Sequence, residues 1–127
     1  MNNCIIKIEK DNECDNFYFL DINDNEGSKL ASFSIDIGEV CSHIPNFRNF
    51  KNLSINDKYN IFNEFVNDLV QKKTKLSLNF IMENGERSIS VNNNIMRFCI
   101  SSMTMSCEFN VIVTEQLINE FQKIELV

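Results

Sequence analysis

Residues 76–91, LSLNFIMENGERSISV, decide the fold of this chain. Apolar residues alternate with polar ones on both sides of Asn84-Gly85, and an Asn-Gly pair favours the type I′ turn of a two-residue hairpin. Pairing the two glutamates that flank this turn places Phe80 opposite Ile89, whereas a shift by one residue would set Phe80 against a serine. The stretch therefore predicts an antiparallel hairpin with one apolar face.

An amphipathic helix is predicted immediately before the hairpin, over residues 55–73. Ser54 is a favourable N-cap, and Asp57 occupies the position of the second partner in a capping box. Apolar residues from Tyr59 to Leu69 recur every three or four positions, while asparagines and charged residues hold the other side. Because that spacing matches the helical repeat, we expect the apolar stripe to be buried.

Four further stretches have the alternation of half-buried strands: residues 4–9, 31–37, 95–100 and 103–113. A fifth, residues 17–22, is apolar on both faces and predicts either a central strand or a strand with an aromatic outer face. A second helix follows, with Thr114 as its N-cap and an apolar stripe that starts at Leu117. The order is therefore βββ–α–ββββ–α, and the short links between the last four strands imply antiparallel pairing. The sequence predicts an α+β fold in which an antiparallel sheet of about seven strands has two helices packed on one face.

The overall composition is that of one folded domain, residues 1–127. Hydrophobic residues make up 43% of the chain and include 11 Phe, which argues against disorder. No apolar run reaches the roughly 18–20 residues of a membrane-spanning helix, and no basic region with a long apolar stretch opens the chain, so we expect a cytoplasmic protein without membrane contact. Abundant Asn and Ile with few Ala, Gly, Pro and Arg are typical of an AT-rich bacterial or viral genome.

The charge is negative and unevenly distributed. The net charge is −6, and residues 1–50 hold nine acidic groups against four basic ones. Such a surface repels phosphate, so nucleic-acid binding is disfavoured and a basic protein partner is favoured. The one basic cluster, residues 72–75, is better explained as the cationic end of the first helix.

Side chains for catalysis or metal binding are sparse. His43 is the only histidine, and Cys41 lies two residues before it. Catalytic Cys and His side chains usually come from separate elements, so we interpret His43 as an ordinary loop residue. Zinc sites need about four Cys or His ligands, and no second pair accompanies Cys41 and His43. The five cysteines are an odd number without a closely spaced pair, which is typical of reduced thiols.

Two other site patterns also fail. The loop that starts at Asp21 is acidic, yet it has Glu26 and Ser32 where a twelve-residue calcium loop needs Gly and Glu. Three isolated glycines cannot form a phosphate-binding loop, and no nucleophile elbow is present. We therefore expect no metal, no cofactor and no enzymatic activity, although carboxylates from distant segments could still meet in space.

The candidate partner-binding residues are apolar side chains on predicted surfaces. Ile81, Ile95 and Ile112 fall by alternation on the sheet face opposite the helices, where they could form an apolar patch together with Ile5 and Cys99. The alternative is that they are scattered single residues, as surfaces commonly carry.

A second candidate contact is the connector between the third strand and the first helix. This segment places Phe47 and Phe50 on a polar background without a regular period. A loop that folds back and covers the core is the better explanation of the same residues.

Three functional hypotheses follow. The first is a non-enzymatic, cytosolic protein–protein interaction module, such as an inhibitor, antagonist or immunity protein of a virus or mobile element. This hypothesis is based on the small size and acidic charge that such proteins share. The second is a self-assembling structural subunit, such as a homodimer that uses the patchy sheet face or an edge strand. The third is a small-molecule binder or enzyme with its site between sheet and helices, which a sizeable pocket containing His43 or grouped carboxylates would favour.

Overall fold

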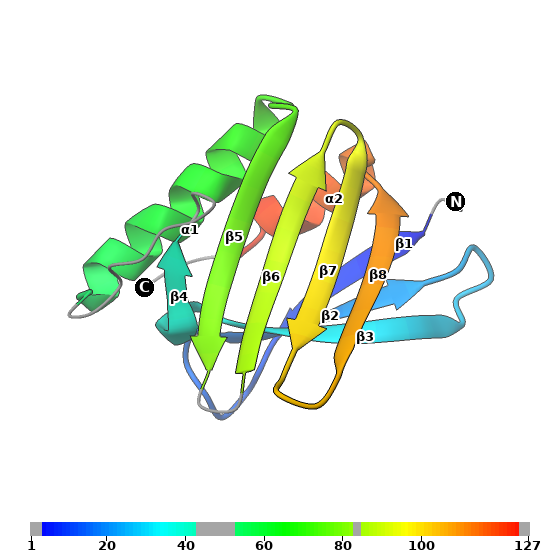
Figure 1. Cartoon of the computed structure of the whole chain (residues 1–127). Coiled ribbons are helices and arrows are strands. Elements are labelled where there is room, and N and C mark those ends of the chain that lie inside the picture. The colour runs from blue at the N-terminus through cyan, green and yellow to red at the C-terminus, as the bar shows by residue number, and fades with distance from the viewer. Residues whose placement is uncertain (1–3, 43–52, 83–84, 125–127) are drawn as a thin grey trace.

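The computed structural model describes residues 4–42, 53–82 and 85–124. It confirms the α+β class, the antiparallel pairing and the predicted order of strands and helices, to which one short strand before the first helix is added. The helices are α1 (Ile55–Val70) and α2 (Glu115–Gln122), and both lie on the same side of a sheet that occupies the front of Figure 1. Phe47 and Phe50 lie outside the described residues.

The first three strands form a sheet of their own. Their order is β1-β2-β3, with bounds β1 (Ile5–Lys10), β2 (Phe17–Asn23) and β3 (Lys29–Asp36). Alternate side chains point inward and are buried, for example Leu20 and Ile35, which are fully inaccessible to solvent. A short 3₁₀ turn, η1 (Ile37–Glu39), then carries the chain out of this sheet.

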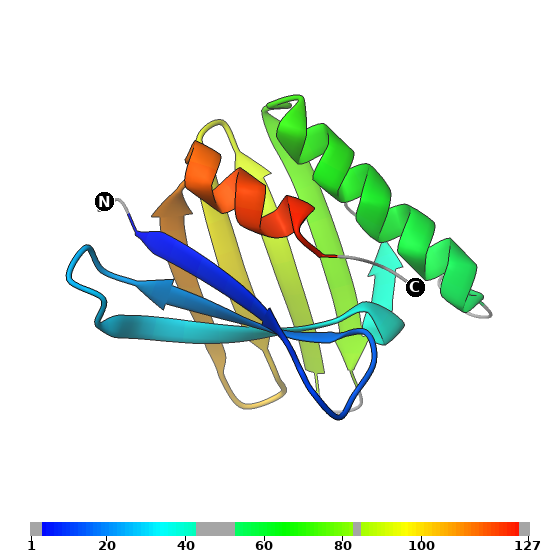
Figure 2. The same cartoon turned by 180° about the vertical axis from the view of Figure 1, so that it is seen from behind.

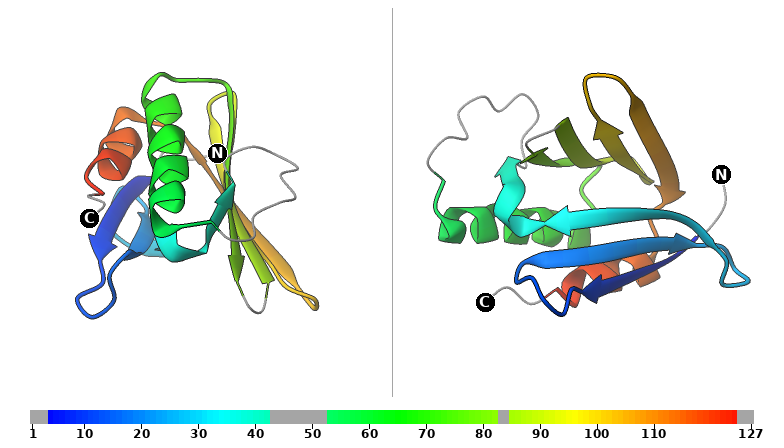
Figure 3. Two further views of the ribbon diagram at one scale, coloured as in Figure 1. Left: turned by 90° about the vertical axis from the view of Figure 1, so that its left-hand side faces the viewer. Right: turned by 90° about the horizontal axis from the view of Figure 1, so that it is seen from below.

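The remaining strands form a second antiparallel sheet in the order β4-β5-β6-β7-β8. Its members are β4 (Val40–Ser42), β5 (Lys75–Met82), β6 (Gly85–Asn92), β7 (Ile95–Ser101) and β8 (Ser106–Ile112). The helices and the three-stranded sheet all lie against one face of this sheet, as the left view of Figure 3 shows. In Figure 2 the strands of the two sheets run in clearly different directions.

The expectation of one sheet of about seven strands is therefore wrong, and the reason is the area that has to be covered. Helices are only about 10 Å across, so two of them cannot cover the apolar face of a seven-stranded sheet roughly 29 Å wide. Dividing the strands lets each sheet cover the other. Phe33 of β3 accordingly lies 5.3 Å from Phe98 of β7 and 6.4 Å from Phe80 of β5, measured between ring centroids.

The first helix is built as predicted at its start. The Ser54 hydroxyl accepts a hydrogen bond from the Asp57 N–H, and the Asp57 carboxylate accepts one from the Ser54 N–H, both at 3.1 Å. Phe62, Phe65 and Leu69 are buried against the sheets. The helix ends at Val70, three residues before the predicted end.

The hairpin of β5 and β6 forms, but its register differs from the prediction by two residues. Phe80 lies opposite Arg87 and Leu78 opposite Ile89, because the two strands already meet at Met82 and Gly85. A two-residue shift keeps every side chain on its predicted face, so alternation alone could not detect it. Gly85 is required here because a Cβ atom would lie 2.2 Å from the Ser101 carbonyl oxygen.

This register places a cation between the sheets. Arg87 points to the covered face, where its guanidinium donates hydrogen bonds to the carbonyl oxygen and the hydroxyl of Ser34 on β3. The same guanidinium lies 5.7 Å from the centre of the Phe33 ring. Arg87 thereby ties the two sheets together at one end of their contact.

The prediction of a strand over residues 103–113 is wrong at its start. β8 begins at Ser106, and Met103 and Met105 are exposed in the preceding turn, the first completely. The Ser102 hydroxyl accepts hydrogen bonds from the N–H groups of Thr104 and Met105. These local bonds replace strand pairing, which is the competition that Ser side chains offer to regular structure.

The second helix seals the outer edge of β1. Gln116 accepts a hydrogen bond from the Ile6 N–H at 3.0 Å and donates one to the Ile6 carbonyl at 2.5 Å, as a neighbouring strand would. One turn later, Glu120 accepts a hydrogen bond from the Ile8 N–H at 2.9 Å. The predicted N-cap of α2 is confirmed, because the Thr114 hydroxyl accepts from the Leu117 N–H.

Glu120 is charged and only 7% exposed. Burial raises the pKa of its carboxyl, but the hydrogen bonds from Lys123 and from the Ile8 N–H, together with the charges of Lys123 and Lys7, outweigh that effect, so the pKa lies below its usual range. The ionised carboxylate therefore stabilises the folded state.

Replacing Phe62 with Ala tests the buried stripe of α1. We expect the free energy of unfolding to fall by about 3–5 kcal/mol, because the ring is 1% exposed and its removal leaves a cavity. Chemical denaturation measures the change. The neighbouring Asn63→Ala, at an exposed position, is the control and should change stability little; a loss below about 1 kcal/mol for Phe62→Ala would show that the stripe is wrongly assigned.

Replacing Glu120 with Ala leaves the Ile8 N–H without its acceptor, so the free energy of unfolding at pH 7 should fall by about 1–3 kcal/mol. The stabilisation by ionised Glu120 is complete above the carboxyl's ordinary pKa of about 4.3 and disappears as the pH falls through the lower folded-state pKa. Denaturation curves of wild type and variant should therefore converge on acidification. A difference that stays constant below pH 4 would contradict this role, and Asn119→Ala provides the exposed control.

Candidate interaction face and cavity

The five-stranded sheet has one face, called here the outer face, that points away from both helices and the three-stranded sheet (Figure 3). No described helix or strand lies over it. Its side chains alternate along β5 to β8 with those that point into the core, and all of them are exposed or half-buried except Ser77, which is buried. They are Lys75, Ser77, Asn79, Ile81, Glu86, Ser88, Ser90, Asn92, Ile95, Arg97, Cys99, Ser101, Ser106, Glu108, Asn110 and Ile112.

The strand register settles which apolar residues of the outer face meet. Ile95 and Ile112 lie directly opposite each other on β7 and β8, and both are half-buried. Ile81 lies in the row of Glu86 and Ser101, six residues or about 20 Å further along the strands. The predicted patch is thus divided into an Ile95–Ile112 pair and a separate Ile81.

The other two residues considered for the patch also lie apart from the pair. Ile5 is on β1, which belongs to the three-stranded sheet, and is 43% exposed. Cys99 occupies the middle of the outer face, opposite Ser88 and Glu108. Only the isoleucine pair therefore remains as a continuous apolar contact.

Between the pair and Ile81 the outer face is polar and close to neutral. Ser77, Ser90, Arg97 and Asn110 form one continuous row across four strands. The Arg97 guanidinium lies 3.5 Å from the Glu108 carboxylate, and both side chains are about half exposed. Such an exposed ion pair contributes little to stability, so these groups are free to exchange partners.

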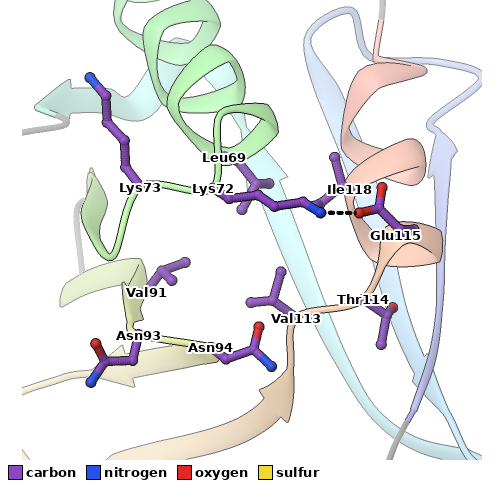
Figure 4. Close-up of a pocket in the computed structure, with 10 residues that line it drawn as sticks. All are labelled: Leu69, Lys72, Lys73, Val91, Asn93, Asn94, Val113, Thr114, Glu115 and Ile118. Carbon is purple, nitrogen blue, oxygen red and sulfur yellow. Dashed lines mark ion pairs between the residues drawn. The ribbon is translucent and has the colours of Figure 1, made fainter.

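A cavity of about 130 Å³ opens at the end of the sheet next to the isoleucine pair. Figure 4 shows it between the end of α1, the start of α2 and the turn that joins β6 to β7. Leu69, Val91, Val113 and Ile118 provide its apolar lining. Its polar lining consists of Lys72, Lys73, Asn93, Asn94, Thr114 and Glu115.

The charged groups at the cavity are already paired. Lys72 lies 2.6 Å from Glu115, as the dashed line in Figure 4 marks, and Lys73 lies 2.9 Å from Asp68. Small-molecule sites usually measure roughly 300–1,000 Å³, so this cavity suits a group of the size of one amino-acid side chain. It lies between sheet and helices, where the third hypothesis placed a site, but only one carboxylate lines it.

The end of α1 explains how the two lysines reach the cavity. The Lys72 N–H donates to the Leu69 carbonyl and the Lys73 N–H to the Asp68 carbonyl, which is the Schellman arrangement that closes helices. This arrangement requires a left-handed residue, normally glycine, and Lys72 holds it with φ +59°. Lys72 and Lys73 therefore form the helix terminus that the sequence indicated, whereas Lys75 of the same basic cluster begins β5.

The remaining chemistry-bearing residues are dispersed. Cys4 is buried, Cys14 and Cys107 are exposed, and none of these cysteines or Cys99 forms a disulfide. Among the described residues, no group of three or more His, Cys, Asp or Glu side chains could hold a metal ion. His43 and the side chain of Cys41 lie outside the described part of the structure.

None of the described helices is both long and apolar enough to cross a membrane.

Sequence reasoning missed three side chains that organise this structure: Arg87, Gln116 and Glu120. Alternation with Ile89 places Arg87 on the covered face in either register, but its partner Ser34 lies on the other sheet, 53 positions away. Gln116 and Glu120 carry a detectable signal, because two acceptors four positions apart lie on one side of a helix. What they bond to, the edge of β1, is about 110 positions away and cannot be read from local pattern.

Comparison with protein-family models, with curated proteins and with solved structures finds no match to this chain.

Replacing Lys72 with Gly should raise the free energy of unfolding by about 0.5–1 kcal/mol, because glycine adopts the left-handed conformation without strain. The lost ion pair with Glu115 is well exposed and contributes little. Lys73→Gly is the matched control and should lower stability, since Lys73 has no positive φ. Chemical denaturation decides between them, and a destabilised Lys72→Gly would contradict the strain at this position.

Proposed function

We propose that this protein is a non-enzymatic protein-binding module that docks on a partner through the Ile95–Ile112 end of the outer face. The observation that carries the proposal is the pairing of these two isoleucines on a sheet face that no described element covers. A small apolar centre within a polar surround is the usual anatomy of a protein interface. The partner is a protein, and the acidic charge disfavours nucleic acid.

The polar part of the outer face suits docking because it is rigid and its side chains are short. Serines and asparagines lose little rotamer entropy when a partner immobilises them, and they can both donate and accept hydrogen bonds. Backbone pairing on both sides fixes β6 and β7. Little ordering energy is therefore needed on binding.

The cavity adjoins the isoleucine pair and extends the docking surface around the end of the sheet. Asn94 and Val113 line the cavity, and the next residues along β7 and β8 are Ile95 and Ile112. A volume of about 130 Å³ with an apolar lining fits one aliphatic side chain of the partner. Such a buried anchor is the typical centre of binding energy in an interface.

The acidic charge favours a basic partner. The net charge is −6, and nine acidic residues fall within residues 1–50. In the turns of the three-stranded sheet, the Asp11 carboxylate accepts a hydrogen bond from the Glu13 N–H, and the Asp24 carboxylate accepts one from the Glu26 N–H. A negative field of this kind accelerates encounter with a basic surface. A cytoplasmic inhibitor, antagonist or immunity protein of a virus or mobile element, directed at a basic enzyme, combines these features.

The experiment compares partner capture by wild type, by Ile95→Ser/Ile112→Ser and by Phe19→Ser, from a lysate of the organism that encodes the protein. Phe19 is 42% exposed on the three-stranded sheet and is the matched control. We expect the double variant to lose the captured protein and Phe19→Ser to retain it. Retention by the double variant, or loss by Phe19→Ser alone, would refute docking at the isoleucine pair.

Repeating the capture at high salt separates anchoring from steering. Exposed charges are screened at distances beyond about 3 Å in 1 M salt, whereas burial of apolar side chains is not weakened. Capture that persists in high salt supports the isoleucine pair and the cavity as anchors. Capture that disappears would show that charge alone holds the partner.

A further inference from the structure

One edge strand of the three-stranded sheet has hydrogen-bond partners on its outer side, whereas one edge strand of the five-stranded sheet has no described strand on its outer side. The outer edge of β1 is sealed by Gln116 and Glu120 of α2, as described above. At the end of the five-stranded sheet, β8 pairs with β7 along seven residues, and no described strand pairs with its other side (Figure 1). This free edge of β8 is an open row of backbone donors and acceptors.

Two hydrogen bonds identify which groups point outward. The Ser102 N–H donates to the Met105 carbonyl at 2.8 Å, and the Val113 N–H donates to the Asn94 carbonyl at 2.9 Å. In an antiparallel ladder the bonded pairs alternate, so the odd-numbered residues of β8 bond to β7. The N–H and carbonyl groups of Ser106, Glu108, Asn110 and Ile112 therefore face the free edge.

This edge lacks the features that usually prevent strand addition. The sequence of β8, SCEFNVI, contains no lysine and no proline, and its register with β7 has no bulge. Phenylalanine, valine and isoleucine favour strands. Its one charge, Glu108, is already paired with Arg97, although the protein as a whole is acidic. Repulsion between two copies is therefore weak at this edge.

We propose that a second copy of this chain adds to the free edge, so that two β8 strands pair antiparallel about a two-fold axis at Phe109. The five-stranded sheets would join into one sheet of ten strands. A two-fold axis brings the same edge of each copy together, so the contact closes on itself and gives a dimer. This dimer is independent of the proposed docking function, because it uses the edge of the sheet and leaves the outer face open.

The register follows from hydrogen bonding and charge. Centring on Phe109 aligns all seven residues and forms about eight backbone hydrogen bonds, the most of any symmetric register. It sets Glu108 opposite Asn110 of the second copy, where the amide can donate to the carboxylate. Centring on Glu108 instead would oppose two like charges and leave two residues of each strand unpaired.

The test measures molar mass by light scattering as protein concentration increases to about 1 mM. Wild type should approach twice 14.8 kDa. Asn110→Pro removes an outward-facing N–H without touching the bonds to β7, and proline is tolerated on edge strands, so this variant should stay at one copy. Asn110→Ser keeps that N–H and should dimerise like wild type. A monomeric wild type, or dimerisation by Asn110→Pro, would overturn the proposal.

A second variant keeps the register testable. In the proposed register Cys107 lies opposite Val111 of the other copy, at a separation that a disulfide can span. Val111→Cys should therefore give a covalent dimer under mild oxidation, whereas the two cysteines within one strand are too far apart to join. Failure to cross-link in a preparation of dimeric mass would overturn the Phe109-centred register. Ile95→Ser/Ile112→Ser should remain dimeric, which separates this test from that of the docking function.

Discussion

The apolar faces of two sheets have to cover each other, and the rest of the structure depends on that constraint. Phe33 of the three-stranded sheet packs against Phe80 and Phe98 of the five-stranded sheet. Two helices could not replace either sheet, because they are too narrow. They fill the remaining space instead, and α2 also satisfies the edge of β1 through Gln116.

The same constraint creates the surface that we propose for docking. With the helices and the three-stranded sheet on one side, the five-stranded sheet presents its outer face away from the core. Backbone pairing holds that face rigid, and register alone decides that Ile95 meets Ile112 while Ile81 lies apart. The free edge of β8 has the same origin, since a sheet that is not closed must end somewhere.

Local signals predicted the elements well and their arrangement poorly. The cap at Ser54 and the cap at Thr114 were both readable, because capping depends on a few adjacent residues. Alternation assigned the faces of the strands, but it is unchanged by a two-residue shift, and so Phe80 faces Arg87 rather than Ile89. The division into two sheets depends on the total area of the apolar sheet face that has to be covered, and no local sequence pattern indicates that area.

The candidate site divides in the same way. Alternation along the strands predicts that Ile95 and Ile112 lie on the same face. Their contact depends in addition on the register of β7 and β8. The cavity is formed by residues from both helices, from β6 and from the segments that connect the strands and helices, so no single stretch of sequence predicts it.

The central claim is that the two sheets pack face to face, and proton NMR tests it most directly. This packing predicts nuclear Overhauser contacts between the rings of Phe33 and Phe98. Contacts of Phe33 confined to its own sheet would contradict it.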